Sequence, residues 1–153
     1  MKNKPTIGIT MGDPSGIGPQ IVAKALQNTA LNDKARFVIY GSNESLTLIA
    51  DRCKLQVRWD RVDANSPRAL EQINSNVIVL DDGEDGLPLL SSKPSQLGGI
   101  VSKRWVESAI HDALLPKNNP RNLDAVVTAP ICKESWFLAG YKWPGHTELF
   151  SSR

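Results

Sequence analysis

The sequence predicts an α/β fold with a largely parallel sheet. Short apolar runs rich in β-branched residues alternate along the chain with stretches whose apolar residues recur at helical spacing. The connections between them are rich in glycine, proline and aspartate, which is typical of loops. Strands separated by helices pair through parallel crossovers, so the alternation itself indicates a layered α/β structure. No internal repeat, low-complexity tract or flexible linker interrupts this pattern.

The first third of the chain contains two strands, each followed by a helix. Residues 6–10 (TIGIT) form a short apolar run and predict a buried strand, and residues 11–18 predict a loop. A helix should begin at Pro19, because proline suits the first helical turn. Residues 36–41 (RFVIYG) predict the second strand, and a helix capped by the serine or asparagine that follows should run through Ala50.

The middle of the chain carries weaker signals. Apolar and polar residues alternate over 55–59, which predicts a third, more exposed strand. The segment 62–76 is ambiguous, with a short helix expected at 69–73. Residues 77–80 (VIVL) predict a buried strand. Residues 81–96 contain DDGEDG and several serines, which indicates a long irregular connection.

The last third opens with the longest helical pattern of the chain, over 97–115. A buried strand is expected at 124–128 (DAVVT), and a helix at 133–139 that a glycine closes. Residues 141–145 predict a turn, and a further element should begin at 146–150.

Composition excludes several classes of protein. The 153 residues include 18 basic and 16 acidic side chains, 41% are hydrophobic and 22% are charged. This composition supports a folded core rather than disorder, and the near-neutral charge argues against nucleic-acid binding. No apolar run approaches the ~20 residues that cross a bilayer, and the N-terminus does not resemble a signal peptide. Cys53 and Cys132 make neither a disulfide framework nor a metal cluster, so we expect a cytoplasmic protein with reduced thiols and no membrane partner.

The first candidate site is the loop GDPSGIGP, which includes Gly12, Asp13, Gly16 and Gly18. It joins a strand to a helix, and ligands bind at such loops in parallel α/β sheets. Its glycines allow a ligand to approach the backbone, and the helix start offers N–H groups to an anion. Ile21 stands where a dinucleotide fingerprint has its third glycine, and no P-loop signature follows. A tight turn without a ligand is the alternative.

Two further candidates lie in the last quarter of the chain. Lys133 follows a buried strand at a helix start and could contact a phosphate or carboxylate, although a solvated lysine is the alternative. Cys132, beside it, is more simply a structural thiol than a nucleophile. His146 and Thr147 follow Pro-Gly and could bind substrate or merely open a helix.

The three segments MGDPSGIGP, TAPICK and GYKWPGHTELF together resemble the 4-hydroxythreonine-4-phosphate dehydrogenase (PdxA) family, over about residues 4–150. The resemblance implies a fold related to isocitrate and isopropylmalate dehydrogenases, with two α/β domains and a cleft between them. It also implies that residues 1–153 are the N-terminal portion of such an enzyme, that the second half is absent, and that the chain alone is inactive.

The resemblance further implies a metal-dependent dehydrogenase that uses NAD or NADP and forms a homodimer when full length. Its substrate is a small phosphorylated hydroxy acid. In the biosynthetic branch, 4-phosphooxy-threonine is oxidised and decarboxylated to 3-amino-2-oxopropyl phosphate on the route to pyridoxal phosphate. A sister branch acts on 4-phosphorylated threonate or erythronate. A non-catalytic phosphate- or partner-binding module is the alternative of another class.

The family's motifs assign roles to some residues and not to others. They imply substrate binding by His146 and Thr147, an anion contact by Lys133, and a cleft loop containing Gly12, Asp13, Gly16 and Gly18. No catalytic residue is assigned. The ligands of the divalent metal (Zn, Mg or Co) are expected outside this chain.

Overall fold

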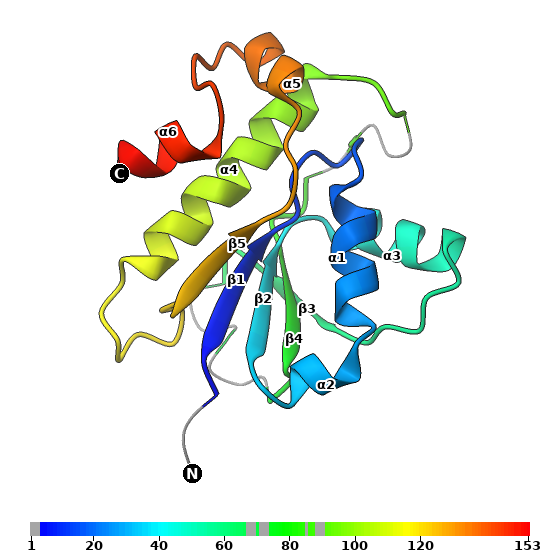
Figure 1. Ribbon diagram of the computed structural model, residues 1–153, viewed down its shortest axis with the longest axis vertical. Helices are drawn as coiled ribbons and strands as arrows, with labels where there is room; N and C mark the ends of the chain where they lie inside the picture. The colour runs from blue at the N-terminus through cyan, green and yellow to red at the C-terminus, as the bar shows by residue number, and fades with distance from the viewer. Residues whose placement is uncertain (1–3, 67–69, 71–73, 85, 88–90) are drawn as a thin grey trace.

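The computed structural model describes residues 4–66, 70, 74–84, 86–87 and 91–153. The part of the chain so described forms one sheet flanked by helices on both faces (Figure 1). The strands are β1 (Thr6–Thr10), β2 (Arg36–Tyr40), β3 (Asp60–Asp63), β4 (Val77–Asp81) and β5 (Ala125–Thr128). The helices are α1 (Gly18–Leu26), α2 (Thr29–Asn32), α3 (Asn43–Arg52), α4 (Gln96–Ala113), α5 (Lys133–Leu138) and α6 (His146–Ser151).

The strand order is β3-β4-β2-β1-β5, and every pair in it is parallel. This confirms the predicted α/β class and its parallel sheet. The chain starts at β1, extends the sheet on one side through β2 and β4, and then crosses back through α4 to place β5 on the other side of β1. The direction of growth therefore changes at β1, so the carboxyl ends of β1 and β5 form the topological switch point, where ligands bind in folds of this kind.

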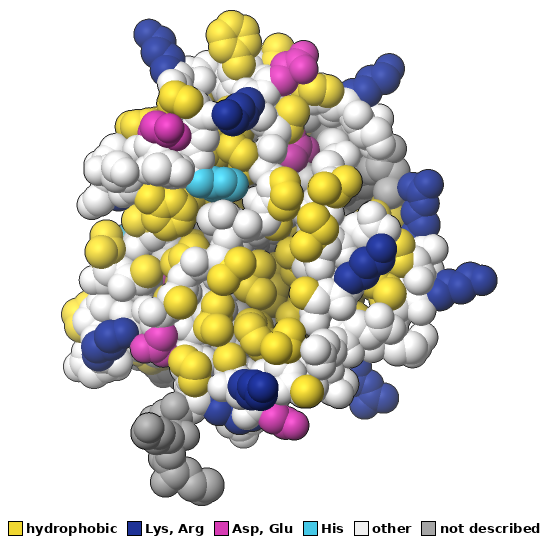
Figure 2. Space-filling model, viewed as in Figure 1, with side chains coloured by type: hydrophobic (Ala, Val, Ile, Leu, Met, Phe, Trp, Pro, Cys, Tyr) yellow, Lys and Arg dark blue, Asp and Glu magenta, His cyan; other side chains and the backbone are white. Residues whose placement is uncertain are grey.

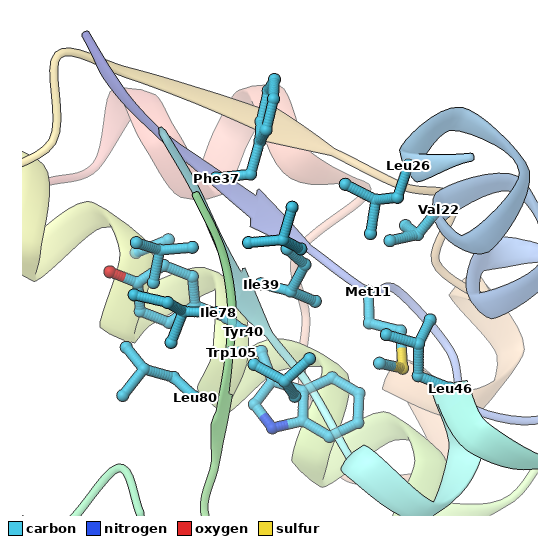
Figure 3. Packing of buried hydrophobic residues seen from close by; sticks show 14 of the residues in the cluster. Met11, Val22, Leu26, Phe37, Ile39, Tyr40, Leu46, Ile78, Leu80 and Trp105 are labelled. Carbon is cyan, nitrogen blue, oxygen red and sulfur yellow. The ribbon is translucent and has the colours of Figure 1, made fainter. Parts of the chain in front are cut away.

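Two layers of helices enclose the sheet. Val22 and Leu26 of α1 and Leu46 of α3 point toward Met11 and Ile39 in the main core (Figure 3). The opposite face of the sheet carries α4, to which β2 is tied by a hydrogen bond from the Tyr40 hydroxyl to Asp112, 2.7 Å long. Burial of these side chains supplies most of the driving force for folding.

A second, smaller core lies on the outer side of α4. It consists of Val106, Ile110, Trp136 and Leu149, and Tyr141 and Trp143 pack against it. Trp136 belongs to α5 and Leu149 to α6, so this core fixes both helices on α4. It therefore sets the place of the residues that open α5 and α6.

One stretch of the sheet has no helix over it. Ile39 and Val127 are both level with Ile9 in the strand register and project to the same face, yet Ile39 is fully buried and Val127 is 52% exposed. Figure 2 shows hydrophobic side chains gathered in the middle of this view of the molecule. The α1 and α3 layer thus covers β2 but not β5.

The middle of the chain departs from the predictions. The strand expected at 55–59 is wrong, because the strand of this region is β3, which starts at Asp60. Parallel pairing with β4 begins only at Asp60, which is level with Ile78, while Trp59 is held outside the sheet by a 2.9 Å hydrogen bond from its indole to Asn43. The helix expected at 69–73 lies outside the described residues except for Leu70.

The strand expected at 124–128 forms as β5, but the prediction that it is buried is wrong, because β5 is an edge strand whose residues are exposed or half-buried. The other elements follow the predictions closely. The longest helix was expected over 97–115 and runs from Gln96 to Ala113. The element expected to begin at 146 is the helix α6. The four-residue helix α2 was not anticipated, and its start is capped by the side chain of Asn28, which accepts from the Ala30 N–H. Across the described residues, no helix is long and apolar enough to cross a membrane.

Candidate functional site

The candidate residues converge on the switch point of the sheet. The glycine-rich loop leaves the carboxyl end of β1, and the segment 129–132 leaves the carboxyl end of the neighbouring strand β5. The Asp13 N–H donates to the Pro130 carbonyl over 3.1 Å, so the two loops touch through their backbones. Segments more than a hundred residues apart in sequence therefore build one edge of the molecule.

Glycine is required at two points of this contact. Gly12 has a φ of +76°, and a Cβ atom there would lie 2.1 Å from the Pro130 carbonyl oxygen. A Cβ atom at Gly18 would lie 2.1 Å from the Met11 carbonyl oxygen, where α1 begins. Both distances are shorter than any real contact, so these glycines allow the loop to fold tightly onto its neighbours.

Asp13 is turned toward the interior rather than toward solvent. Its side chain is 2% exposed. One carboxylate oxygen accepts from the Ser15 N–H over 2.8 Å, and the other accepts from the Ser135 hydroxyl over 2.6 Å. The carboxylate thus joins the first loop to α5, although Asp13 also borders a hollow outside the loop, together with Ser15 and Gly16.

A hollow of about 190 Å³ lies outside this loop. Gly16 lines it together with Lys93 and Cys132. A wider hollow of about 470 Å³ adjoins it, since Ser15, Gly16 and Ser92 line both, and it extends to Arg52 and Cys53 at the end of α3. Both hollows lie beside the loop that joins β1 to α1, and both are large enough to admit small polar groups.

Lys133 and the Pro-Gly-His-Thr segment lie together. Lys133 is the first residue of α5 and is exposed. A Cβ atom built on Gly145 would lie 3.9 Å from the Lys133 Cε, so the lysine stem passes beside the residue that precedes His146. The structure therefore brings together the residues that the family motifs assign to an anion contact and to substrate binding.

His146 begins α6 and is half-buried. Its ring stands edge-on to that of Trp136, with centroids 5.9 Å apart and an interplanar angle of 76°. Trp136 is itself fixed by a 2.9 Å hydrogen bond from its indole to Ser102. The His146 Nε2 is buried and has no hydrogen-bond partner among the described residues. Burial lowers the pKa of His146, which favours the neutral ring. Thr147, next in the chain, is exposed.

Sequence reasoning missed two residues that hold this region together. The Ser95 side chain caps α4 by accepting from the Gly98 N–H over 3.0 Å, and the Ser95 N–H donates to the Ser135 hydroxyl oxygen over 3.1 Å. Serine three residues before a glycine at a helix start is a recognisable cap signal, whereas nothing local marks Ser135 as a partner of Asp13.

The described residues do not fit a metal ion, because none of their His, Cys, Asp and Glu side chains form a group of three or more that could hold one. The first loop also lacks the third glycine of a dinucleotide fingerprint, so it is not assigned to NAD(P). The fold and these residues define an α/β protein with a polar, glycine-rich edge at its switch point.

Comparison with known proteins identifies the family. Residues 33–153 match the family model described as pyridoxal phosphate biosynthetic protein PdxA. A 4-hydroxythreonine-4-phosphate dehydrogenase of Trichlorobacter lovleyi is 31% identical over 159 residues, covering 97% of this chain and 43% of the relative. A D-threonate 4-phosphate dehydrogenase of Cupriavidus necator is 31% identical over 147 residues, covering 96% of this chain and 42% of the relative. The chain belongs to the PdxA family.

Solved structures agree with this assignment. A 4-hydroxythreonine-4-phosphate dehydrogenase from Burkholderia phymatum superposes with a TM-score of 0.82 at 25% identity, covering 99% of this chain and 44% of that structure. The corresponding enzyme from Klebsiella pneumoniae gives a TM-score of 0.77 at 29% identity, with 97% and 44% covered. The chain thus spans less than half the length of these relatives.

Proposed function

We propose that this chain forms one wall of the substrate site of an NAD(P)-dependent dehydrogenase that oxidises the secondary hydroxyl of a small phosphorylated hydroxy acid. One observation carries the proposal. In a chain of the PdxA family, Lys133 opens the helix that follows β5, and its stem passes beside Gly145, the residue that precedes His146. Relatives of this chain are named as dehydrogenases of 4-hydroxythreonine 4-phosphate and of D-threonate 4-phosphate.

Each exposed residue has a chemical role in this proposal. The ammonium group of Lys133 would pair with the phosphate or carboxylate of the substrate. The hydroxyl of Thr147 would exchange a hydrogen bond with a substrate oxygen. The neutral ring of His146 offers one donor and one acceptor, and its packing against Trp136 limits how the ring can turn. Together these groups would bind and orient the substrate.

The reaction assigned to the whole enzyme is a hydride transfer. The hydrogen on the carbinol carbon would leave as hydride to NAD⁺ or NADP⁺, the hydroxyl proton would leave to a base, and a ketone would form. With 4-phosphooxy-threonine the ketone lies β to the carboxylate, so loss of carbon dioxide would give 3-amino-2-oxopropyl phosphate. A divalent metal is part of this proposal, and its ligands are proposed to lie outside this chain, since no three His, Cys, Asp or Glu side chains among the described residues form a group that could hold it. Homodimerisation likewise stays a proposal.

D-threonate 4-phosphate is the second candidate substrate. It differs from 4-phosphooxy-threonine in bearing a hydroxyl where the latter has an amino group. Relatives named for each substrate match this chain at 31% identity, so overall identity favours neither.

Binding by the chain itself is the first test. We expect titration with D-threonate 4-phosphate to shift the NMR signals of the His146 ring and the Lys133 side chain, without any NADH formation. The other histidine, His111, is 72% exposed and serves as an internal control. A shift of His111 equal to that of His146, or no shift of either, would contradict the proposed site.

Catalysis can be tested in a chimera. Residues 1–153 would replace the matching segment of the Trichlorobacter lovleyi relative, of which they cover 43%. We expect NADH formation with one of the two substrates. Because losing a hydrogen bond to a charged group costs about 1.5–3 kcal/mol, His146→Ala should raise KM roughly 10- to 100-fold, while His111→Ala leaves it unchanged. A folded chimera that binds phosphorylated acids without turnover would favour the non-catalytic module.

A further inference from the structure

We propose that Asp13 is a positioning residue for Lys133. Through Ser135, its buried carboxylate sets the place of the first turn of α5 relative to the loop that follows β1. The inference rests on the proposed function, because it gives Lys133 its use in the substrate site. It goes further in assigning Asp13 a task inside the fold rather than contact with the ligand.

The link consists of a short buried chain of hydrogen bonds. The Ser135 hydroxyl donates to an Asp13 carboxylate oxygen over 2.6 Å, across 122 residues of sequence. The same hydroxyl oxygen accepts from the Ser95 N–H over 3.1 Å. The second carboxylate oxygen of Asp13 accepts from the Ser15 N–H over 2.8 Å. One carboxylate and one hydroxyl therefore tie together the loop after β1, the start of α4 and the start of α5.

The start of α4 packs too closely for this arrangement to slide. A Cβ atom at Gly99 would lie 2.0 Å from the Ser135 carbonyl oxygen, and one at Gly98 would lie 3.1 Å from an Asp13 carboxylate oxygen. Asp13 and Ser135 are 2% and 0% exposed. Close-packed protein interiors are hardly compressible. The lengths of these hydrogen bonds therefore fix the distance between the loop after β1 and α5.

Lys133 lies two residues before Ser135 in the first turn of α5. A helical turn moves as a unit, so a displacement at Ser135 carries Lys133 with it. The Lys133 Cε lies 3.9 Å from the position of a Cβ on Gly145, beside the start of α6. The distance between Lys133 and the His146 segment thus depends on where Asp13 holds α5.

Both carboxylate oxygens of Asp13 must act as hydrogen-bond acceptors in this link. In Asp13→Asn, the amide oxygen can still accept from the Ser15 N–H. The amide nitrogen would then face the Ser135 hydroxyl, whose proton would lose its acceptor. An unsatisfied buried group costs about 1–3 kcal/mol, so the two loops should separate or reorient in this nearly isosteric variant.

A matched control is available on α4. Asp112 is 1% exposed, and one of its oxygens accepts from the Tyr40 hydroxyl and from Arg121. It stands 14 residues beyond Gly98, which corresponds to about 20 Å along the helix. Asp112→Asn therefore disturbs an equally buried carboxylate, with its own cost in stability, far from Lys133.

The experiment compares Asp13→Asn, Ser135→Ala and Asp112→Asn in this chain, at a temperature where all are folded. Without ligand, Asp13→Asn and Ser135→Ala should shift the Lys133 side-chain NMR signals and raise the exchange rate of the Ser95 amide at least tenfold, whereas Asp112→Asn should change neither. Asp13→Asn and Ser135→Ala should each weaken the binding of D-threonate 4-phosphate roughly 3- to 10-fold. The double variant Asp13→Asn/Ser135→Ala should bind no more weakly than Asp13→Asn alone, because both changes remove the same hydrogen bond. Asp112→Asn should bind as the unmodified chain does.

Two results would overturn the inference. One is that Asp13→Asn leaves Lys133 and the Ser95 amide unchanged, and the other is that Asp13→Asn and Asp112→Asn weaken binding equally. If Asp13→Asn does not fold, Ser135→Ala decides the same question, since it removes the same hydrogen bond from the other side. If the unmodified chain does not bind the phosphorylated acid, the proposed function fails, while the ligand-free signals still decide whether Asp13 positions Lys133.

Discussion

The two loops that meet at the switch point are built for different tasks. The loop after β1 is folded inward, with Met11 fully buried and Asp13 2% exposed. The region that starts at Lys133 and ends at Thr147 exposes Lys133 and Thr147, although Ser135 within it is buried and His146 is half-buried. The family motifs imply substrate binding by His146 and Thr147, and they imply for the first loop only a place in the cleft. In the structure, Gly12 and Asp13 of the first loop hold it against its neighbours, whereas Lys133 and Thr147 of the second region are exposed to solvent.

The same contrast appears in two glycines with positive φ. Gly12, in the inward loop, has a φ of +76° and no room for a Cβ atom. Gly140, in the outward region after α5, has a φ of +81° and nothing within 4 Å of the position of its Cβ. Both need the left-handed conformation, and only Gly12 also needs the space.

Gly12→Ala should therefore have the largest effect on stability. The left-handed conformation costs alanine about 1–2 kcal/mol, and overpacking against the Pro130 carbonyl adds about 1–3 kcal/mol. We expect a loss of about 2–5 kcal/mol in the free energy of unfolding, measured with urea. A loss below about 2 kcal/mol would show that the loops can separate cheaply and that the inward region is not rigid.

Gly140→Ala should have a smaller effect, because it adds only the backbone term. The hydrogen bond from the Gly140 N–H to the Phe137 carbonyl, 2.9 Å long, closes α5 and should survive the change. We expect a loss of about 1–2 kcal/mol by the same measurement. Equal losses at Gly12 and Gly140 would remove the distinction between the two regions.

The sequence predicts the secondary structure of this chain better than it predicts the contacts between distant segments. The buried strand at 77–80 and the long helix at 97–115 were predicted closely because their apolar pattern is local. The strand at 124–128 was expected to be buried and is instead exposed or half-buried at the sheet edge, which its apolar run does not reveal. The glycine-rich loop was predicted to join a strand to a helix, either as a ligand loop or as a tight turn, and its backbone contact with Pro130 was not predicted. The strand expected at 55–59 was wrong because edge pairing depends on where β4 lies, which no local alternation reveals.

The orientation of the site residues was not predictable in the same way. Asp13 stands in a motif typical of ligand loops, and its inward orientation depends on Ser135, 122 residues away. His146 and Lys133 come together because Trp136 and Leu149 share a core on α4. Such long-range contacts leave no signal in the spacing of residues, which is why the motifs locate the site but do not say which side chains face it.

The pH dependence of stability should show that His146 is half-buried, between the buried residues of the first loop and the exposed Thr147. Burial lowers its pKa below the ordinary value of 6.5, so the unfolded chain binds the proton more readily than the folded one. The contribution of the neutral ring is therefore complete above about pH 6.5 and is lost progressively as the pH falls from there through the lower pKa of the folded state.

We expect the urea midpoint of the unmodified chain to fall more than that of His146→Gln when the pH is lowered from 7.5 to 5.5. The difference between these two falls should be smaller than the change in midpoint caused by either glycine substitution. Parallel pH profiles for the two proteins would mean that the ring is fully solvated. In that case His146 would belong entirely to the outward region.

Thr147→Val should have the smallest effect on stability and is the sharpest test of the outward region. Thr147 is exposed near the start of α6, so its hydroxyl supports nothing in the fold, and the change in unfolding free energy should stay within about 0.5 kcal/mol. Valine keeps the shape of threonine and removes only the hydroxyl. If that hydroxyl bonds the substrate, affinity for D-threonate 4-phosphate should fall by about 0.5–1.5 kcal/mol, which is roughly 2- to 13-fold. A variant that loses stability but not affinity would place Thr147 with the inward residues and reverse the division.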